Sequence, residues 1–241
     1  MIAHLNLRTK IRERWDAFHA GLAVLGFQVK DCAIDKVDTL PVDGILVTWN
    51  RIGVADRVAR AFEAAGRPVV VVENPSWGKL VPGHWLQVAS CLHNTRGRVP
   101  YNGPERWDAL GVPLAPMRTG DGETVVLAQR GIGSPPVAMP RGWTQQNAHR
   151  GRVRQHPNDG LQKVAPLAHD LRNARRVVHW SSAAGIEALA LGIENANGYA
   201  EWIGACDGTE TGRLGTFRRM AWSQWRLEEI ASGAALQGVL H

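Results

Sequence analysis

The sequence predicts an α/β fold made of two halves, each built on an open, mostly parallel sheet. In both halves, short apolar segments of strand length alternate with longer segments whose apolar residues recur every three or four positions. Residues 69–72 are all valine, which is typical of a parallel strand buried on both faces. Several predicted strands end in polar residues and glycine, where Rossmann-like sheets bind their ligands.

The first half has the order strand, helix, strand, strand, helix, strand. Its first helix is predicted from Trp15, Phe18 and Leu22, which share one face, and Gly26 ends it. Its second helix ends at Gly66 for the same reason. We expect strands at 2–7, 27–29, 45–48 and 69–72, and helices at 8–25 and 54–65.

The second half repeats the alternation after a stretch with a weaker pattern. In that stretch, residues 84–93 and 104–110 are predicted to be helical. We then expect strands at 123–127, 152–154 and 176–180, and helices at 161–173 and 183–191. Leu214, Phe217, Ala221 and Trp225 predict one long amphipathic helix over 212–233.

These patterns predict four parts of the chain. Residues 1–112 form an N-terminal Rossmann-like domain, and residues 113–122, rich in Pro, Thr and Gly, form a linker. Residues 123–211 form a C-terminal Rossmann-like domain. Residues 212–241 form a final helix that packs back across both domains.

The composition and the net charge limit the kinds of partner that the protein is expected to bind. The 241 residues carry a net charge of +6, and 23 of the 28 basic residues are arginine, which suits phosphate and carboxylate partners. An arginine-rich codon bias would explain the same composition. The three cysteines form no metal or disulfide pattern, and no apolar run or signal-peptide core is present, so we expect a cytoplasmic protein. We expect a monomer or weak dimer.

The turn after the strand at 176–180 has the composition of a phosphate site. Ser181 and Ser182 lead into a helix that begins with small residues, and such a turn offers backbone N–H groups at the positive end of the helix dipole. Glu187 lies early on this helix, within reach of a ribose hydroxyl. An ordinary strand–helix connection with a serine N-cap, without any ligand, would have the same sequence.

Several segments together resemble glycosyltransferases of the GT-B type. The strand-end pair His156-Pro157, followed by the segment 179–192, is similar to capsular-polysaccharide-type transferases, in which these elements bind the nucleotide of the donor. Segments 48–51, 72–78, 129–133 and 221–230 are similar to small phage-encoded members, some of which glycosylate hydroxymethylated bases in phage DNA. The resemblance implies two Rossmann-like domains facing a cleft.

Transfer from a nucleotide sugar requires stabilisation of the leaving diphosphate. Arginine and the helix start are expected to supply it without an essential metal or other cofactor, since no Asp-x-Asp motif is present. His156, His179 and Glu187 each have an alternative structural reading, as a strand-end, core or helix-dipole residue. The predicted donor-binding residues are Arg130, Gly131, Gly133, Arg154, His156, His179, Ser181, Ser182, Ala183 and Glu187.

Transfer also requires a base for the acceptor hydroxyl and a surface for the acceptor. His93 in a basic loop and Glu73 at a strand end are the predicted catalytic bases, with His93 preferred. Solvated arginines and core tryptophans would give the same composition as an acceptor surface. The predicted acceptor or DNA-binding residues are Trp49, Asn50, Arg51, Asn74, Trp77, Arg96 and Arg98.

The resulting hypothesis is a hexosyltransferase-type enzyme that moves a sugar from a UDP-sugar to 5-hydroxymethylcytosine in phage DNA. One alternative is the same chemistry in the synthesis of a surface polysaccharide or lipid-linked glycan. A second alternative is a non-catalytic nucleic-acid-binding protein with the same fold, for which the basic charge would suffice.

Overall fold

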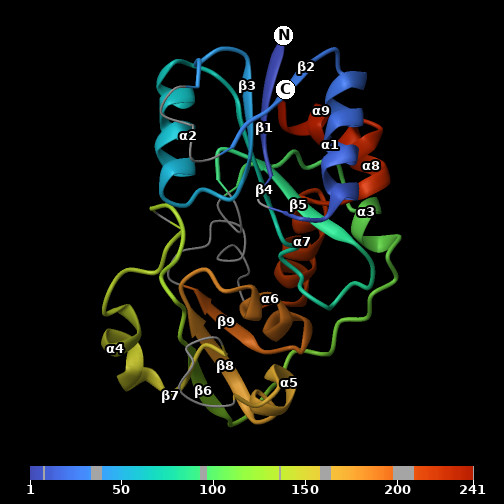
Figure 1. Cartoon of the computed structure of the whole chain (residues 1–241). Coiled ribbons are helices and arrows are strands. Elements are labelled where there is room, and N and C mark those ends of the chain that lie inside the picture. The colour runs from blue at the N-terminus through green and yellow to red at the C-terminus, as the bar shows by residue number, and fades with distance from the viewer. Residues whose placement is uncertain are drawn as a thin grey trace. The chain divides into compact units, whose positions relative to one another are not determined.

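The computed structural model of the chain describes residues 1–7, 9–33, 40–92, 97–135, 137–157, 164–197 and 209–240 (Figure 1). These residues form a mixed α/β structure with one six-stranded and one four-stranded sheet. The chain divides into two compact units. The first unit comprises Met1–Pro75, Gly83–Asn102 and Met220–His241, and the second comprises Ser76–Pro82 and Gly103–Arg219.

The first unit contains the six-stranded sheet, in the order β10-β5-β4-β3-β1-β2. Strands β1 to β4 are parallel, whereas β5 and β10 run antiparallel to their neighbours. Apolar side chains on both faces of β3 and β4 explain their continuous apolar runs. The strands are β1 (Ile2–Asn6), β2 (Gln28–Asp31), β3 (Ile45–Trp49), β4 (Val69–Glu73), β5 (Trp85–Ser90) and β10 (Gln224–Arg226).

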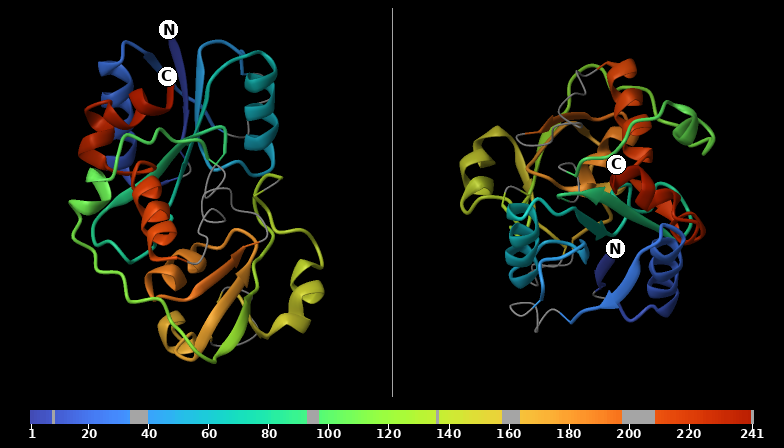
Figure 2. Two further views of the ribbon diagram at one scale, coloured as in Figure 1. Left: turned by 180° about the vertical axis from the view of Figure 1, so that it is seen from behind. Right: turned by 90° about the horizontal axis from the view of Figure 1, so that it is seen from above.

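Helices cover both faces of this sheet. Helices α1 (Arg12–Val24), α8 (Leu227–Ala231) and α9 (Ala234–Leu240) lie side by side on one face, and α2 (Val54–Ala64) lies on the other (Figures 1 and 2). Alternate residues of each strand separate the two cores. Val47 packs on the α1 side with Phe18, whereas Leu46 packs on the α2 side with Phe62.

The second unit contains the four-stranded sheet, whose strands are all parallel and lie in the order β7-β6-β8-β9. Trp143 of α4 packs on one face of this sheet, and Leu171 and Ala188 pack on the other. The strands are β6 (Glu123–Leu127), β7 (Arg152–Arg154), β8 (Ala174–His179) and β9 (Glu194–Asn197). The connecting helices are α4 (Trp143–Asn147), the 3-10 helix η3 (Ala148–Arg150), α5 (Leu167–Asp170) and α6 (Ala183–Ala190).

An aromatic cluster joins the remaining helices of the second unit. Trp107 of α3 (Glu105–Asp108) stacks on Phe217 of α7 (Glu210–Ala221), with ring centroids 4.6 Å apart. The ring centroids of Trp77 and Trp107 are 6.1 Å apart. An ion pair of 2.7 Å between Arg218 and Asp108 holds α7 to α3 at the surface.

Most predicted strands and helices are confirmed within a few residues, but two helix predictions are wrong. Residues 85–90 form β5 rather than part of a helix over 84–93, because they pair with β4 as the sheet continues. The long helix predicted over 212–233 is interrupted by β10, because Trp225 and its neighbours pair with β5. Tertiary pairing therefore overrides the helical period there.

The second unit also differs from the predicted boundaries. The predicted linker at 113–122 belongs to the second unit, where Ala115 and Arg118 donate backbone hydrogen bonds to residues of the α6 end. Of the helix predicted over 161–173, residues 161–163 lie outside the described part, and the described helix is Leu167–Asp170. The C-terminal residues 220–241 belong to the first unit.

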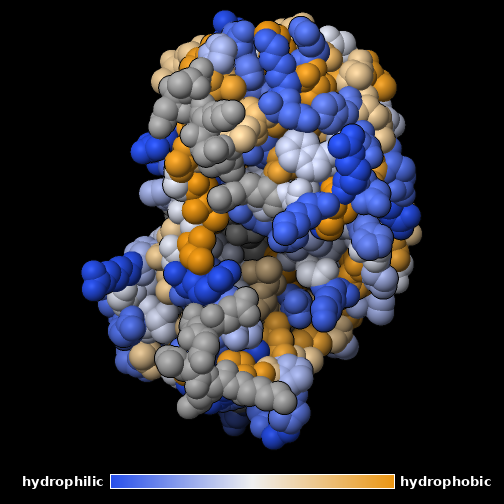
Figure 3. Space-filling model, viewed as in Figure 1, coloured by the Kyte–Doolittle hydropathy of each residue, from blue (hydrophilic) through white to orange (hydrophobic). Residues whose placement is uncertain are grey.

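The surface of the described residues is mixed in character. On the face shown in Figure 3, hydrophilic and hydrophobic residues are interspersed. None of the helices that the structure describes has the length and apolar character needed to cross a membrane.

Candidate functional site

In the first unit, polar residues gather at the carboxyl ends of β3 and β4, next to the point where the strand order changes direction. β1 connects to β2 on one side and β3 connects to β4 on the other, so the ends of β1 and β3 flank a topological switch point. Trp49 ends β3 and Asn50 follows it, and on the neighbouring strand Glu73 ends β4 and Asn74 follows it. Ligands of parallel α/β sheets bind at such an edge.

Glu73 is a partly buried carboxylate at this edge. Its Oε1 accepts hydrogen bonds from the backbone N–H of Asn74 at 2.8 Å and from the Asn74 side chain at 3.1 Å. Burial raises the pKa of Glu73, and the hydrogen bonds with Asn74 and Asn50 and the charge of Arg14 oppose that rise. A carboxylate with a raised pKa can accept a proton closer to neutral pH.

The neighbouring residues shape the surroundings of Glu73. Asn50 has a φ of +41°, which is uncommon outside glycine and is tolerated by asparagine. Trp49 is largely buried, and the Arg14 guanidinium lies over its ring, with Cζ 5.2 Å from the ring centroid. The edge thus combines a carboxylate, amides, an aromatic face and a cation.

Two other predicted acceptor residues have structural partners in the first unit. Arg51 is buried and forms ion pairs with Asp56 at 3.0 Å and Glu63 at 2.6 Å, so its guanidinium joins the loop after β3 to α2. Arg98 is exposed, and its backbone pairs with Ser90 at the end of β5. His93 and Arg96, the other predicted residues of that region, lie outside the described residues.

In the second unit, the switch point lies between the ends of β6 and β8, and Gln129 bridges it. The Gln129 side-chain oxygen accepts hydrogen bonds from the backbone N–H groups of Trp180 at 3.0 Å and Ser181 at 2.9 Å. Its side-chain nitrogen donates to the Ser181 hydroxyl, which donates in turn to the Val137 carbonyl. Ser181 is therefore buried and committed to internal bonds.

His179 and Ser182 build the start of α6. The Ser182 hydroxyl caps the helix by accepting from the Ala184 N–H at 3.2 Å. The Ser182 N–H donates to Nδ1 of His179 at 3.1 Å, and the imidazole is fully buried. Burial lowers the pKa of His179 to about 4, so its ring is neutral. Ala183, the first helical residue, is exposed.

Arg130 lies in a polar pocket of about 440 Å³ beside the ends of β6 and β7. Gly131 borders the same pocket and has a φ of +66°, and Gly133 follows with a φ of +140°. Arg130 and Arg141 are both exposed, and no acidic residue lines this pocket among the described residues. Two arginines without an acidic neighbour favour an anionic ligand.

Arg154 and His156 follow the same edge. Arg154 is buried, and its guanidinium forms an ion pair of 2.7 Å with Asp170 and donates to the Ala165 carbonyl. Most of its hydrogen-bonding capacity is therefore used within the unit. His156, two residues beyond the end of β7, is half-buried.

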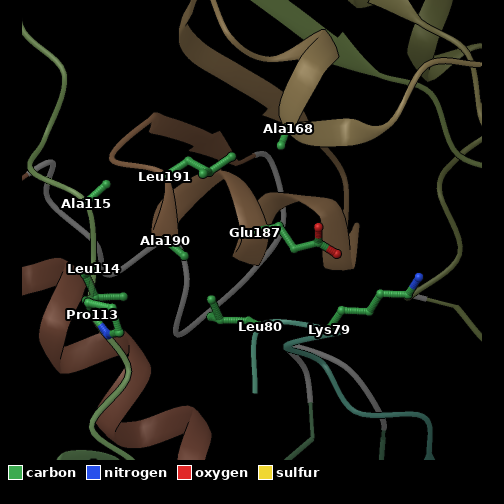
Figure 4. Close-up of a pocket in the computed structure, with 9 residues that line it drawn as sticks. All are labelled: Lys79, Leu80, Pro113, Leu114, Ala115, Ala168, Glu187, Ala190 and Leu191. Atoms are coloured by element: carbon green, nitrogen blue, oxygen red, sulfur yellow. The ribbon is translucent and has the colours of Figure 1, made fainter. Parts of the chain in front are cut away.

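Glu187 borders a different, more apolar pocket of about 510 Å³. The Glu187 carboxylate extends from α6, and Lys79 extends from the 76–82 segment on the other side (Figure 4). Burial raises the pKa of Glu187, and the charges of Lys79 and Arg154 oppose that rise. Trp77, predicted to contact the acceptor, is fully buried in the aromatic cluster of the second unit.

Sequence reasoning missed three residues of these edges. Gln129 lies two residues beyond the predicted strand 123–127, but its role depends on β6 and β8 being neighbours, which the sequence does not show. Arg141 reaches the Arg130 pocket from the loop before α4. Arg14 could have been found from the sequence, because it lies four residues before Phe18 and so shares the core-facing side of α1.

The described residues contain no group of three or more His, Cys, Asp or Glu side chains that could hold a metal ion.

Comparison with known proteins gives a fold-level match. No protein-family model matches the chain, and no curated protein matches it. The solved beta Kdo 2,4 transferase of Thermosulfurimonas dismutans KpsC aligns with a TM-score of 0.53 and 16% identity, over 93% of this chain and 91% of that chain. The beta Kdo 2,7 transferase of the same protein aligns with a TM-score of 0.50 and 10% identity, over 98% and 99%. The chain therefore has a fold similar to that of these transferases.

Proposed function

We propose that the chain is a glycosyltransferase of the two-domain GT-B type, which acts in the synthesis of a polysaccharide or lipid-linked glycan. The observation that carries the proposal is the fold match to two Kdo transferases over nearly the full length of each chain. Polar and charged groups at the carboxyl-end edges of both sheets add support, because α/β sheets bind substrates there.

In this proposal the second unit binds the nucleotide-sugar donor. Arg130 and the capped start of α6 face the donor phosphates, where fixed positive charge stabilises the leaving group as it gains negative charge. Glu187, at the pocket with Lys79, contacts the nucleoside. His179, Ser181 and Gln129 hold the turn in place from beneath. Neither a divalent metal nor another cofactor is required.

The first unit binds the acceptor and supplies the base. The acceptor hydroxyl oxygen bonds to the anomeric carbon of the donor sugar, and the bond from that carbon to the donor phosphate oxygen breaks. The nucleotide leaves with the electron pair, and the hydroxyl proton moves to Glu73. The raised pKa of Glu73 and its place beside Asn50 favour it for this role. His93 is the alternative base.

The acceptor we favour is a sugar hydroxyl rather than hydroxymethylcytosine in DNA. The fold match to Kdo transferases supports the glycan reading, and it lends no support to a DNA acceptor. The net charge of +6 fits either an anionic glycan or DNA, so charge does not favour one over the other.

A transfer assay tests the proposal. The protein is incubated with a panel of nucleotide sugars and with acidic and neutral oligosaccharides, and products are identified by mass spectrometry. We expect a mass gain on an oligosaccharide. Glu73→Gln should lower kcat by about 100-fold or more, because the variant cannot accept the proton. Arg130→Gln should lower transfer by about 100-fold through loss of leaving-group stabilisation.

Matched variants control for general damage to the protein. Glu13→Gln changes an exposed carboxylate of α1, and Arg150→Gln changes an exposed arginine of η3. Both should retain the activity of the unmodified protein. Transfer to hydroxymethylated DNA, but to no oligosaccharide, would replace the glycan proposal with the DNA hypothesis. Absence of transfer with every donor and acceptor would contradict the enzyme assignment.

A further inference from the structure

At the sheet edge of the first unit, an arginine is held over an aromatic ring beside Glu73. Arg14 comes from the middle of the first turn of α1, and its Cζ lies 5.2 Å from the centroid of Trp49. Trp49 ends β3 and pairs in register with Val72, the residue immediately before Glu73. The register places Trp49 and Glu73 at the same end of two adjacent strands. The Arg14 guanidinium, over the Trp49 ring, is near enough for its charge to act on Glu73.

Among the residues that the structure describes, none forms a direct ion pair with Arg14. Within the described part of the chain, its guanidinium forms no hydrogen bond and no ion pair, although it is half-buried. Partial burial lowers the pKa of Arg14, and the charge of Glu73 raises it. Burial raises the pKa of Glu73, and the hydrogen bonds with Asn74 and Asn50 lower it. Among the described charged residues, Arg14 is the one whose charge also lowers the pKa of Glu73.

We propose that Arg14 is a positioning residue for Glu73: held over the Trp49 ring, its guanidinium stabilises the charged carboxylate at the edge where the acceptor binds. The inference rests on the proposed function in taking Glu73 as the base. Its physical logic is a balance of two effects. Burial disfavours the ionised carboxylate, and a nearby fixed cation restores it without forming a close ion pair that would block proton transfer.

The arrangement explains why arginine suits this position. The Arg14 guanidinium lies over the Trp49 ring, and this cation–π contact does not use its hydrogen-bond donors. Lysine at position 14 would retain the charge but would lose the planar guanidinium. Glutamine would remove the charge and keep much of the side-chain length.

A titration of Glu73 tests the inference without any need for enzyme activity. Glutamate labelled with ¹³C at Cδ is incorporated into the protein, and the Glu73 resonance is identified by its absence in Glu73→Gln. Its chemical shift is followed with pH, which gives the titration midpoint of Glu73. In Arg14→Gln we expect the midpoint to rise by about 0.5 pH units or more, because an opposing charge is lost. Arg14→Lys should give a smaller rise. Arg12→Gln, which removes an exposed arginine of the same helix, should leave the midpoint unchanged.

The outcomes separate this inference from the proposed function. An unchanged midpoint in a folded Arg14→Gln protein, or an equal rise in Arg12→Gln, would overturn the inference. If Arg14→Gln does not fold, an unchanged midpoint in Arg14→Lys and Trp49→Leu together would overturn it. A raised midpoint with no transfer to any acceptor would leave the coupling of Arg14 and Glu73 intact and reject the glycosyltransferase proposal. Where transfer is found, the acidic limb of kcat/KM should move to higher pH in Arg14→Gln.

Discussion

His179 is a buried, neutral histidine that supports the turn at the end of β8. Its Nδ1 accepts the Ser182 N–H, so protonation at Nδ1 would remove that acceptor from the start of α6. Its ring also fills the space beside Gly185, where an added Cβ would lie 2.2 Å from Nε2. Histidine and glycine are thus matched in size at this turn, and a larger residue at position 185 would displace the imidazole.

The lowered pKa of His179 predicts a loss of stability in acid. The ring binds a proton near pH 6.5 when exposed and near pH 4 when buried, so its contribution is complete above pH 6.5 and falls as the pH drops towards 4. The full loss is up to about 3 kcal/mol. Urea unfolding at pH 7.5 and pH 5 should show the fall, and His179→Asn should show less of it. His149→Asn, at an exposed position, should behave like the unmodified protein. Equal pH dependence in His179→Asn would disprove this account.

The sequence predicted that several polar residues lie at the strand ends, but it did not predict which of them are bonded within their own unit. Glu73 and Arg130 were predicted, and the structure places them at the carboxyl-end edges of their sheets. Arg51 and Ser181 were chosen by the same reasoning, yet both are buried and bonded within their units. The sequence could not separate these cases, because the partners Glu63 and Gln129 meet them only after the chain has folded.

At the scale of elements, strands that are buried on both faces could be predicted from their own residues. Strands that form only because they pair with a neighbouring strand could not. The runs at 45–48 and 69–72 are apolar enough to exclude most alternatives, and both form strands. The short segments of β5 and β10 fit helix and strand patterns equally well. They become strands because β5 pairs with β4 at the edge of the parallel strands, and β10 then pairs with β5.

The bridge that Gln129 makes between the ends of β6 and β8 predicts a local effect of its removal. Gln129→Ala would leave the Trp180 and Ser181 N–H groups without their acceptor, at a cost of about 1–3 kcal/mol. Hydrogen exchange should accelerate at these two amides and in the first turn of α6. Gln145→Ala changes another glutamine beside the same pocket and should leave exchange at those amides unchanged. Slow exchange in Gln129→Ala would mean that another group holds the turn.

At the scale of the whole molecule, the first unit is assembled from three separate segments of the chain. Its C-terminal segment adds β10 to the sheet and contributes Trp225, Ile230 and Leu236 to the same core as β1 and β3. The sequence suggested contiguous domains, because local patterns do not reveal which distant segment completes a core. Each unit has its own hydrophobic clusters, so each can lose stability separately.

The contact between α1 and α8 offers a test of that separation. A Cβ added at Gly21 would lie 1.9 Å from the backbone oxygen of Ile230, so Gly21→Ala must push α8 away from α1. We expect a loss of at least about 2 kcal/mol, because backbone atoms cannot yield as a side chain can. Hydrogen exchange should accelerate in β1, β3 and β4, whereas β6 and β8 should retain their protection. Gly215→Ala, at an exposed helical site with open space around it, should preserve protection in both units. If Gly21→Ala instead accelerates exchange equally in both sheets, the two units unfold as one cooperative body, and the three-segment unit has no stability of its own.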